Sequence, residues 1–374
     1  MKSRKKLLNV GTARHIFLIL AAIAVRICLF GYETLDYKNF LSHWVEFFRQ
    51  NGGFAALKLS VGNYNIPYLY FLALFSYIPV NDLYLIKGLS CVFDFVLAYA
   101  VYRLSKSRTA AYISLFLPTV VMNGALWGQC DSIYVSLALL AVAMALDDRP
   151  VLSMVLFACS FGFKLQAVFI LPVAVILLMR GKYKWYHFLV FPLAYFILIL
   201  PAVLMGRPLR DAFMLYADQM GTVGDAMNYN APSLTAIIRN PDPNALILLA
   251  FAAMLALFLL YRRDVRVLTA LMVCVIPFLL PHMHDRYFYA CDVMALVLAA
   301  SSLYLIPAAV LAECASLICY IAYLQTHYIR FGNSWITNKA GAWFIVFALV
   351  SWTVFLFSEG KISSLRTDEA PPHE

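Results

Sequence analysis

Long apolar runs recur along the chain and are separated by short polar or basic segments, as at 17–30, 85–101 and 246–260. A helix needs about 20 mostly apolar residues to cross a bilayer, so these runs predict an all-α, polytopic transmembrane bundle with about 12 spans (range about 11–13). The spans are expected at 15–31, 84–102, 109–126, 132–146, 150–163, 166–179, 186–205, 243–261, 267–281, 340–357 and as a pair within 287–323.

Two longer segments interrupt this alternation, at 32–66 and 206–242. The apolar run at 68–79 is short for a span and fits an interfacial or re-entrant helix that belongs to the first long loop. No soluble domain is evident. The sequence therefore predicts one transmembrane domain over 1–360, followed by a short tail at 361–374.

Composition excludes a soluble globular protein. Hydrophobic residues make up 63% of the chain and charged residues 13%, about half the share of a typical soluble domain. A net charge of +9 could indicate nucleic-acid binding, but the basic residues stand in short clusters between apolar runs, which is the pattern that sets membrane topology. The eight cysteines include no CxxC pair and are interpreted as small core residues.

A basic cluster at 2–6 precedes the first predicted span, and basic residues at 103–108, 149, 180–184 and 262–266 follow every second span after it. The positive-inside rule then places both termini in the cytoplasm and the loops 32–66 and 206–242 outside a cell membrane. The N-terminus could imitate a signal peptide, but Gly31-Tyr32-Glu33 is a poor cleavage site, so the first apolar run is kept as a helix.

In this topology the polar motifs gather on the outer face, at Asp36, 63–65, 127–131, Lys164, 228–230 and 282–286. Polar residues at the ends of spans are costly and are candidates for function. Asp36 follows the first helix and could act as a general base from a half-buried cavity, or be an ordinary solvated loop acid. Asp131 or Ser132 could cap a helix.

The 127–131 motif also suggests sugar binding, because an indole can stack on a sugar while Gln129 and Asp131 form hydrogen bonds to it. His282, His284 and Asp285 could suggest a metal site, but the run is too generic, and a divalent metal is not indicated. Arg286 is expected to bind an anion such as phosphate, or to snorkel to the interface.

The remaining polar residues each allow more than one role. Lys164 has the same two interpretations as Arg286. Asn65 and Asn230 each belong to an Asn-Tyr-Asn-x-Pro turn, which backbone preference alone can explain. The acids Asp94, Asp292 and Glu313 could suggest a proton-coupled carrier, but they form no clear relay.

The motifs together resemble those of the polyprenol-phosphate-sugar-dependent glycosyltransferases of the GT-C type. They are most similar to bacterial relatives of the second mannosyltransferase of GPI-anchor synthesis. The resemblance covers about 30 to 290, and Trp-Gly-Gln-Cys-Asp-Ser at 127–132 and His-Met-His-Asp-Arg-Tyr-Phe at 282–288 are its most specific parts. The other matching stretches are 36–40, 63–68, 163–167 and 228–232.

This resemblance implies an external active site, a polyprenyl-phosphate sugar donor and a first-loop acid, Asp36, as the catalytic base. Many members of the family carry a paired acidic motif there, whereas only Glu33 stands near Asp36 in this chain. The expected reaction is an inverting displacement that transfers a hexose, with mannose the closest suggestion, to a cell-surface glycan or glycolipid. Substrate contacts are expected from Asn65, Trp127, Gln129, Asp131, Lys164, Gln166, Asn230, His282, His284, Asp285 and Arg286.

The expected partners are therefore the sugar donor, the acceptor and the lipid bilayer, with no nucleic acid and no cofactor. A transporter or flippase of lipid-linked sugars is the alternative. Transporters tend to contain inverted repeats and broken helices at the midplane of the membrane. No convincing repeat is found here, and the polar residues gather on one face, which favours the enzyme.

Overall fold

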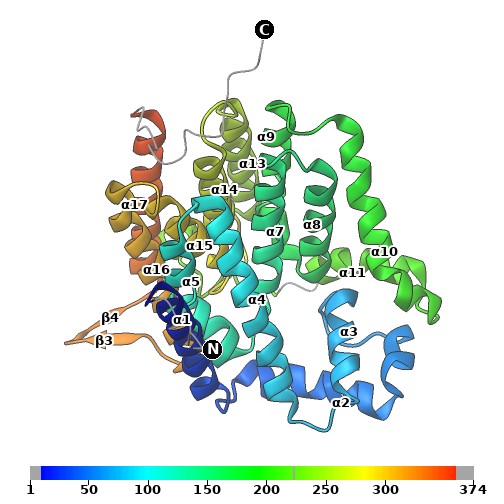
Figure 1. Cartoon of the computed structure of the whole chain (residues 1–374). Helices are drawn as coiled ribbons and strands as arrows, with labels where there is room; N and C mark the ends of the chain where they lie inside the picture. The colour runs from blue at the N-terminus through cyan, green and yellow to red at the C-terminus, as the bar shows by residue number, and fades with distance from the viewer. Residues whose placement is uncertain (1–9, 222–223, 359–374) are drawn as a thin grey trace, which may run out of the picture.

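A computed structural model describes residues 10–221 and 224–358, and most of them lie in helices (Figure 1). The predicted all-α class is confirmed. The elements of the first half are α1 (Val10–Leu29), η1 (Tyr37–Leu41), α2 (Ser42–Gln50), η2 (Gly53–Lys58), α3 (Ile66–Phe75), α4 (Asp82–Ser105), α5 (Arg108–Ser114), α6 (Pro118–Val121), η3 (Met122–Trp127), α7 (Asp131–Leu146) and α8 (Pro150–Phe163).

The second half continues with helices and adds two pairs of short strands. Its elements are η4 (Leu165–Phe169), α9 (Val173–Met179), η5 (Trp185–Leu189), α10 (Val190–Leu204), α11 (Leu209–Gly221), β1 (Asn228–Tyr229), α12 (Leu234–Ile237), α13 (Pro243–Leu259), α14 (Val265–Leu279), β2 (Met283–His284), α15 (Tyr289–Ala299), η6 (Leu303–Leu305), α16 (Ile306–Leu324), β3 (Ile329–Phe331), β4 (Ser334–Ile336) and α17 (Asn338–Phe357). Strand β1 pairs with β2 in parallel, and β3 with β4 antiparallel.

Five of the described helices are long and apolar enough to cross a membrane. A bent pair, Arg108–Ser114 with Pro118–Trp127, would make a sixth span. Seven shorter apolar helices of 10–17 residues accompany them. These helices indicate a membrane protein, and the count of about 12 spans stays a prediction that requires the shorter helices to cross as well.

The bent pair differs from the single straight helix expected at 109–126. Its two parts meet at 48°, and Pro118 opens the second part. Proline has no amide hydrogen and clashes with the preceding turn, so it breaks the helix there. The second part ends as the π-helix η3 and is closed by Gly128, whose φ of 79° lies in the left-handed region. This turn aims 127–131 at the candidate site.

Two buried cations tie α1 to the rest of the bundle. Arg26 pairs with Asp94 of α4 at 2.8 Å and also donates to the carbonyl of Leu115. Lys87 of α4 donates to the carbonyls of Leu29, Phe30 and Tyr32 at distances of 3.1, 3.1 and 2.6 Å. A helix end leaves carbonyls without partners, and Lys87 satisfies them at the end of α1. The loop that carries Asp36 therefore starts from a fixed point.

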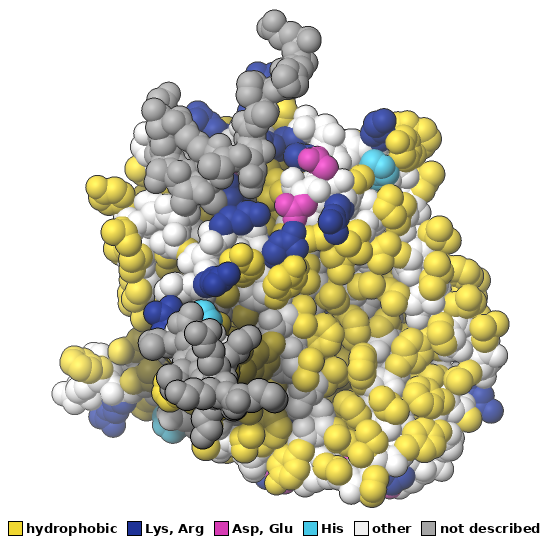
Figure 2. Space-filling view, viewed as in Figure 1, with side chains coloured by type: hydrophobic (Ala, Val, Ile, Leu, Met, Phe, Trp, Pro, Cys, Tyr) yellow, Lys and Arg dark blue, Asp and Glu magenta, His cyan; other side chains and the backbone are white. Residues whose placement is uncertain are grey.

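The predicted basic clusters meet at one end of the bundle. Arg103 bonds to Asp147, Arg180 donates to the carbonyl of Arg263, and Arg266 donates to the carbonyl of Leu104. Figure 2 shows Lys and Arg side chains gathered in the upper part of the molecule, above a broad hydrophobic surface. The basic residues at 2–6 and the tail at 361–374 lie outside the described residues. Which side of a membrane each end faces stays a prediction.

Candidate functional site

A cavity of about 830 Å³ collects most of the polar motifs. The loop after α1, the turn before α3, the α8–η4 junction, the paired strands β1 and β2 and the end of α16 form its walls. Ten of the twelve residues predicted from sequence line it: Asp36, Asn65, Gln129, Lys164, Gln166, Asn230, His282, His284, Asp285 and Arg286. Asp36 and Arg286, which are 250 residues apart in the chain, therefore share one space.

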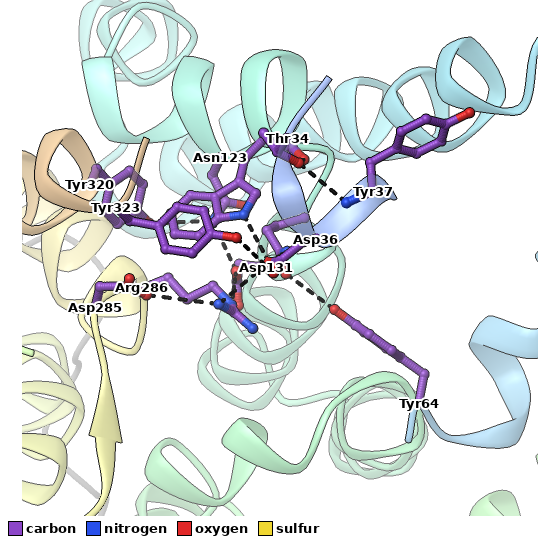
Figure 3. Close-up of polar contacts among 12 residues, drawn as sticks. Thr34, Asp36, Tyr37, Tyr64, Asn123, Asp131, Asp285, Arg286, Tyr320 and Tyr323 are labelled. Carbon is purple, nitrogen blue, oxygen red and sulfur yellow. Dashed lines mark hydrogen bonds and ion pairs between the residues drawn. The ribbon is translucent and has the colours of Figure 1, made fainter. Parts of the chain in front are cut away.

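Asp36 is held at the cavity wall by three hydrogen-bond donors (Figure 3). Its Oδ2 accepts from Trp127 Nε1 at 2.9 Å and from Gln129 Nε2 at 2.7 Å. Its Oδ1 accepts from the Tyr323 hydroxyl at 2.7 Å. Asp36 stands at the N-cap of η1, but its side chain makes no capping bond. The carboxylate is thus fixed by side chains of the site and does not cap the start of η1.

Two cations from other segments line the same cavity. Arg286 lies 3.9 Å from Asp36, 3.9 Å from Asp131 and 3.7 Å from Asp285, measured between nitrogen and carboxylate oxygen. Lys164 donates to Asp131 Oδ1 at 2.5 Å. Asp131 is fully buried and also accepts from Asn123 at 2.9 Å. Asp131 therefore anchors the two cations from behind the cavity.

Arg286 retains unused hydrogen-bond donors. Its three carboxylate neighbours lie beyond hydrogen-bond distance, and its Nε is buried with no partner among the described residues. Burial lowers the pKa of Arg286, but the negative groups around it outweigh burial and raise the pKa above its usual value. A charged guanidinium with free donors in a cavity is suited to bind an oxyanion in its fork.

The strand pair β1–β2 presents the rest of this wall. The ring of His284 stacks on Tyr229 with centroids 4.6 Å apart. Burial, together with the charges of Arg286 and Lys164, lowers the pKa of His284 to about 4, so its imidazole is neutral at pH 7. Burial raises the pKa of Asp285 to about 7 despite the neighbouring Arg286. Asp285 is therefore only partly ionised near pH 7.

Trp127 and Asp131 do not line the cavity, which differs from their expected contact with a sugar. Trp127 is fully buried, and its ring is stacked on Tyr323 with centroids 4.2 Å apart. Its face is thus already covered. The capping alternative also fails, because Cys130 is the N-cap residue of α7, and Ser132 instead donates to the carbonyl of Ser90.

Three of the lining residues have structural partners. Asn65 caps α3 by accepting from the Ile66 amide and also donates to Tyr195. Asn230 adopts φ of 66° and donates to the carbonyl of Cys319. His282 is bonded through Nδ1 to the Ala226 carbonyl. Their positions at the cavity follow from the turns that they build.

Sequence reasoning missed the contribution of α16. Tyr323 holds Asp36, and Tyr320 packs edge-on against Trp127 and accepts from Asn123. Tyr64 was seen only as part of a turn, yet its hydroxyl donates to Gln129 Oε1 at 3.1 Å. A signal for α16 was present in two tyrosines three residues apart near the end of an apolar helix, which places them on one face.

Among the described residues, no group of three or more His, Cys, Asp or Glu side chains could hold a metal ion. Glu33, the acid nearest to Asp36 in sequence, is exposed and pairs with Lys38 at 3.4 Å. A comparison with models of known protein families and a comparison with curated proteins both find no match.

Proposed function

We propose that this protein is a membrane glycosyltransferase that moves a hexose from a polyprenyl-phosphate donor to a hydroxyl of an extracytoplasmic glycan or glycolipid. The observation that carries the proposal is the arrangement of Asp36 and Arg286 across one cavity. A carboxylate held by three donors faces a guanidinium with unused donors, and their closest atoms lie 3.9 Å apart. A reacting sugar phosphate needs both a base and an anion partner.

Asp36 has one acceptor position to spare. An ionised carboxylate can accept about four hydrogen bonds. Both lone pairs of Oδ2 are used by Trp127 and Gln129, and one lone pair of Oδ1 is used by Tyr323. The base would therefore act through Oδ1. The acceptor hydroxyl would pass its proton to this atom while its oxygen attacks the anomeric carbon.

Arg286 would stabilise the leaving group. As the bond from the anomeric carbon to the phosphate oxygen breaks, that oxygen keeps the bonding electron pair and gains negative charge. Arg286 and Lys164 supply positive charge in a half-enclosed cavity, where electrostatic stabilisation is stronger than in water. Lys164 is 7% exposed and already bonds to Asp131, so Arg286 is the better placed of the two to contact the phosphate.

Neutral groups would hold the sugar beside these charges. Gln166 and His284 line the same cavity, and a neutral imidazole can both donate and accept a hydrogen bond. A single displacement inverts the configuration at the anomeric carbon, since the nucleophile enters opposite the phosphate. No residue is required to form a covalent intermediate.

The test uses the full chain in lipid vesicles with radiolabelled polyprenyl-phosphate mannose and a glycolipid extract as acceptor. We expect the label to leave the polyprenyl phosphate and appear in the glycolipid. A flippase would instead carry the intact donor from one leaflet to the other. Label that changes leaflet while it stays on the polyprenyl phosphate would refute the transferase proposal.

A further inference from the structure

Three aromatic side chains cover a part of the cavity that the proposed reaction does not use. Phe40, Trp44 and Tyr64 all line it. Their rings touch in sequence, with centroids 6.1 Å apart between Phe40 and Trp44 and 5.5 Å apart between Trp44 and Tyr64. These three residues are called the aromatic wall below.

The aromatic wall continues directly from Asp36. Asp36, Phe40 and Trp44 are spaced four residues apart, and helical backbone runs without a break from the N-cap of η1 into α2. Residues four apart lie on the same helix face. The ring centroids of Phe40, Trp44 and Tyr64 follow one another at 6.1 and 5.5 Å. This row is longer than one sugar ring and has the proposed base at its end.

The wall is rigid and is connected to the base. Gly62 has φ of 63°, and a Cβ at this position would come within 2.5 Å of the Trp44 ring, so only glycine lets the backbone lie against the indole. Tyr64 donates to Gln129, which in turn donates to Asp36. A ligand that moves Tyr64 would therefore also shift Gln129 and, through it, the Asp36 carboxylate.

We propose that the aromatic wall is a stacking subsite for the acceptor, and that the acceptor carries at least one further hexopyranose ring beside the ring whose hydroxyl reacts. The inference rests on the proposed function. One face of a pyranose presents C–H groups with slight positive charge, which the negative face of an aromatic ring attracts. A free monosaccharide would leave most of the wall unused.

An exposed amide beside the aromatic wall favours a sugar over the hydrocarbon chain of the donor. Asn63, next to Tyr64 in the chain, is exposed and lines the same cavity. Amides that face a hydrocarbon chain lose their hydrogen bonds to water and gain none, which is costly. Sugar hydroxyls can replace the water at this amide.

The test measures binding, without transfer, on the full chain in nanodiscs. The probes are octyl glycosides with one, two and three mannose rings, titrated calorimetrically. We expect the second ring to strengthen binding by up to about ten-fold, the affinity equivalent of an aromatic contact. Trp44→Leu should remove this gain and leave the affinity for the one-ring glycoside unchanged.

Leucine is chosen because it keeps an apolar surface, so a subsite for the hydrocarbon chain would survive the change. Phe40→Leu is a second variant that needs no repacking, since Phe40 is 51% exposed. Trp185→Leu is the matched control, because Trp185 is 73% exposed and does not line the cavity. This control should bind all three glycosides as the wild type does.

Equal affinity of the wild type for one-ring and two-ring glycosides would overturn the subsite. A second-ring gain that persists in Trp44→Leu would also overturn it, because an apolar surface alone would then account for the gain. The two proposals fail separately. Ring-dependent binding without sugar transfer would count against the transferase alone, whereas transfer without ring-dependent binding would count against the subsite alone.

Discussion

Replacing Asp36 by Asn is the most direct test of the chemistry, because the two side chains have nearly the same shape. The amide oxygen of Asn can take the place of Oδ2 and accept from Trp127 and Gln129. Its amino group then faces the Tyr323 hydroxyl, which can rotate from donor to acceptor. All three partners of the wild-type carboxylate therefore keep a hydrogen bond.

The expected effects on folding and on turnover differ widely. Since no polar group is orphaned, the free energy of unfolding should fall by about 1 kcal/mol at most. An amide cannot take the acceptor's proton, so the rate of transfer should fall about 10²–10⁴-fold, which is about 3–5 kcal/mol in the activation free energy. The donor KM should stay unchanged or fall, because Arg286 loses a carboxylate neighbour.

Transfer of labelled mannose in vesicles and thermal unfolding in detergent measure the two quantities on the same preparation. Glu33→Gln is the control, since Glu33 is an exposed acid three residues away that pairs only with Lys38 among the described residues. Its activity should equal that of the wild type. An Asp36→Asn variant with more than a tenth of wild-type turnover would remove Asp36 as the base.

Three further predictions concern charge and topology. Arg286→Lys keeps the charge but loses the two-pronged donor, so the donor KM should rise at least ten-fold with little change in Tm. Asp285 binds a proton in the folded state up to about pH 7, so rising pH destabilises the wild type between about pH 4 and 7. Asp285→Asn should therefore gain Tm relative to the wild type from pH 5 to pH 8. In a Cys28→Ser background, a cysteine at Lys106 should react with an impermeant reagent only from the cytoplasm, and one at Gln50 only from outside.

The positions of the helices could be predicted from apolar periodicity, because a run of apolar residues in a mostly apolar chain has few other structures open to it. The run at 109–126 shows the limit of this reasoning. It is mostly apolar, yet Pro118 divides it and the π-helix η3 rotates its end toward the site. Hydropathy measures transfer to lipid and contains no information on the direction of a backbone.

The place of the candidate site could be predicted, but not which of its residues face the cavity and which lie behind them. Motifs at the ends of predicted spans meet at one cavity, as the alternating topology requires. Whether a polar residue faces the cavity or supports it depends on side-chain packing, which sequence spacing does not determine. Trp127 and Asp131 lie in the strongest motif, and both are buried behind the residues that line the cavity. Tyr323 lies in an apolar helix, and only the fold brings it to Asp36.

The attachment of α1 determines how the bilayer acts on the site. Only 11% of the apolar stretch of α1 is buried against the rest of the protein, so most of the surface of this helix is left for lipid. Apolar contact between helices brings little advantage in a bilayer, and the polar contacts of α1 include those of Arg26 and Lys87 near its C-terminal end and of His15, which bonds to Tyr112 near its N-terminal end. A helix answers a change in bilayer thickness by tilting. With the two buried cations as a pivot, the tilt loads the His15–Tyr112 hydrogen bond at the far end of α1, and Asp36 keeps its place as the thickness of the surrounding membrane varies.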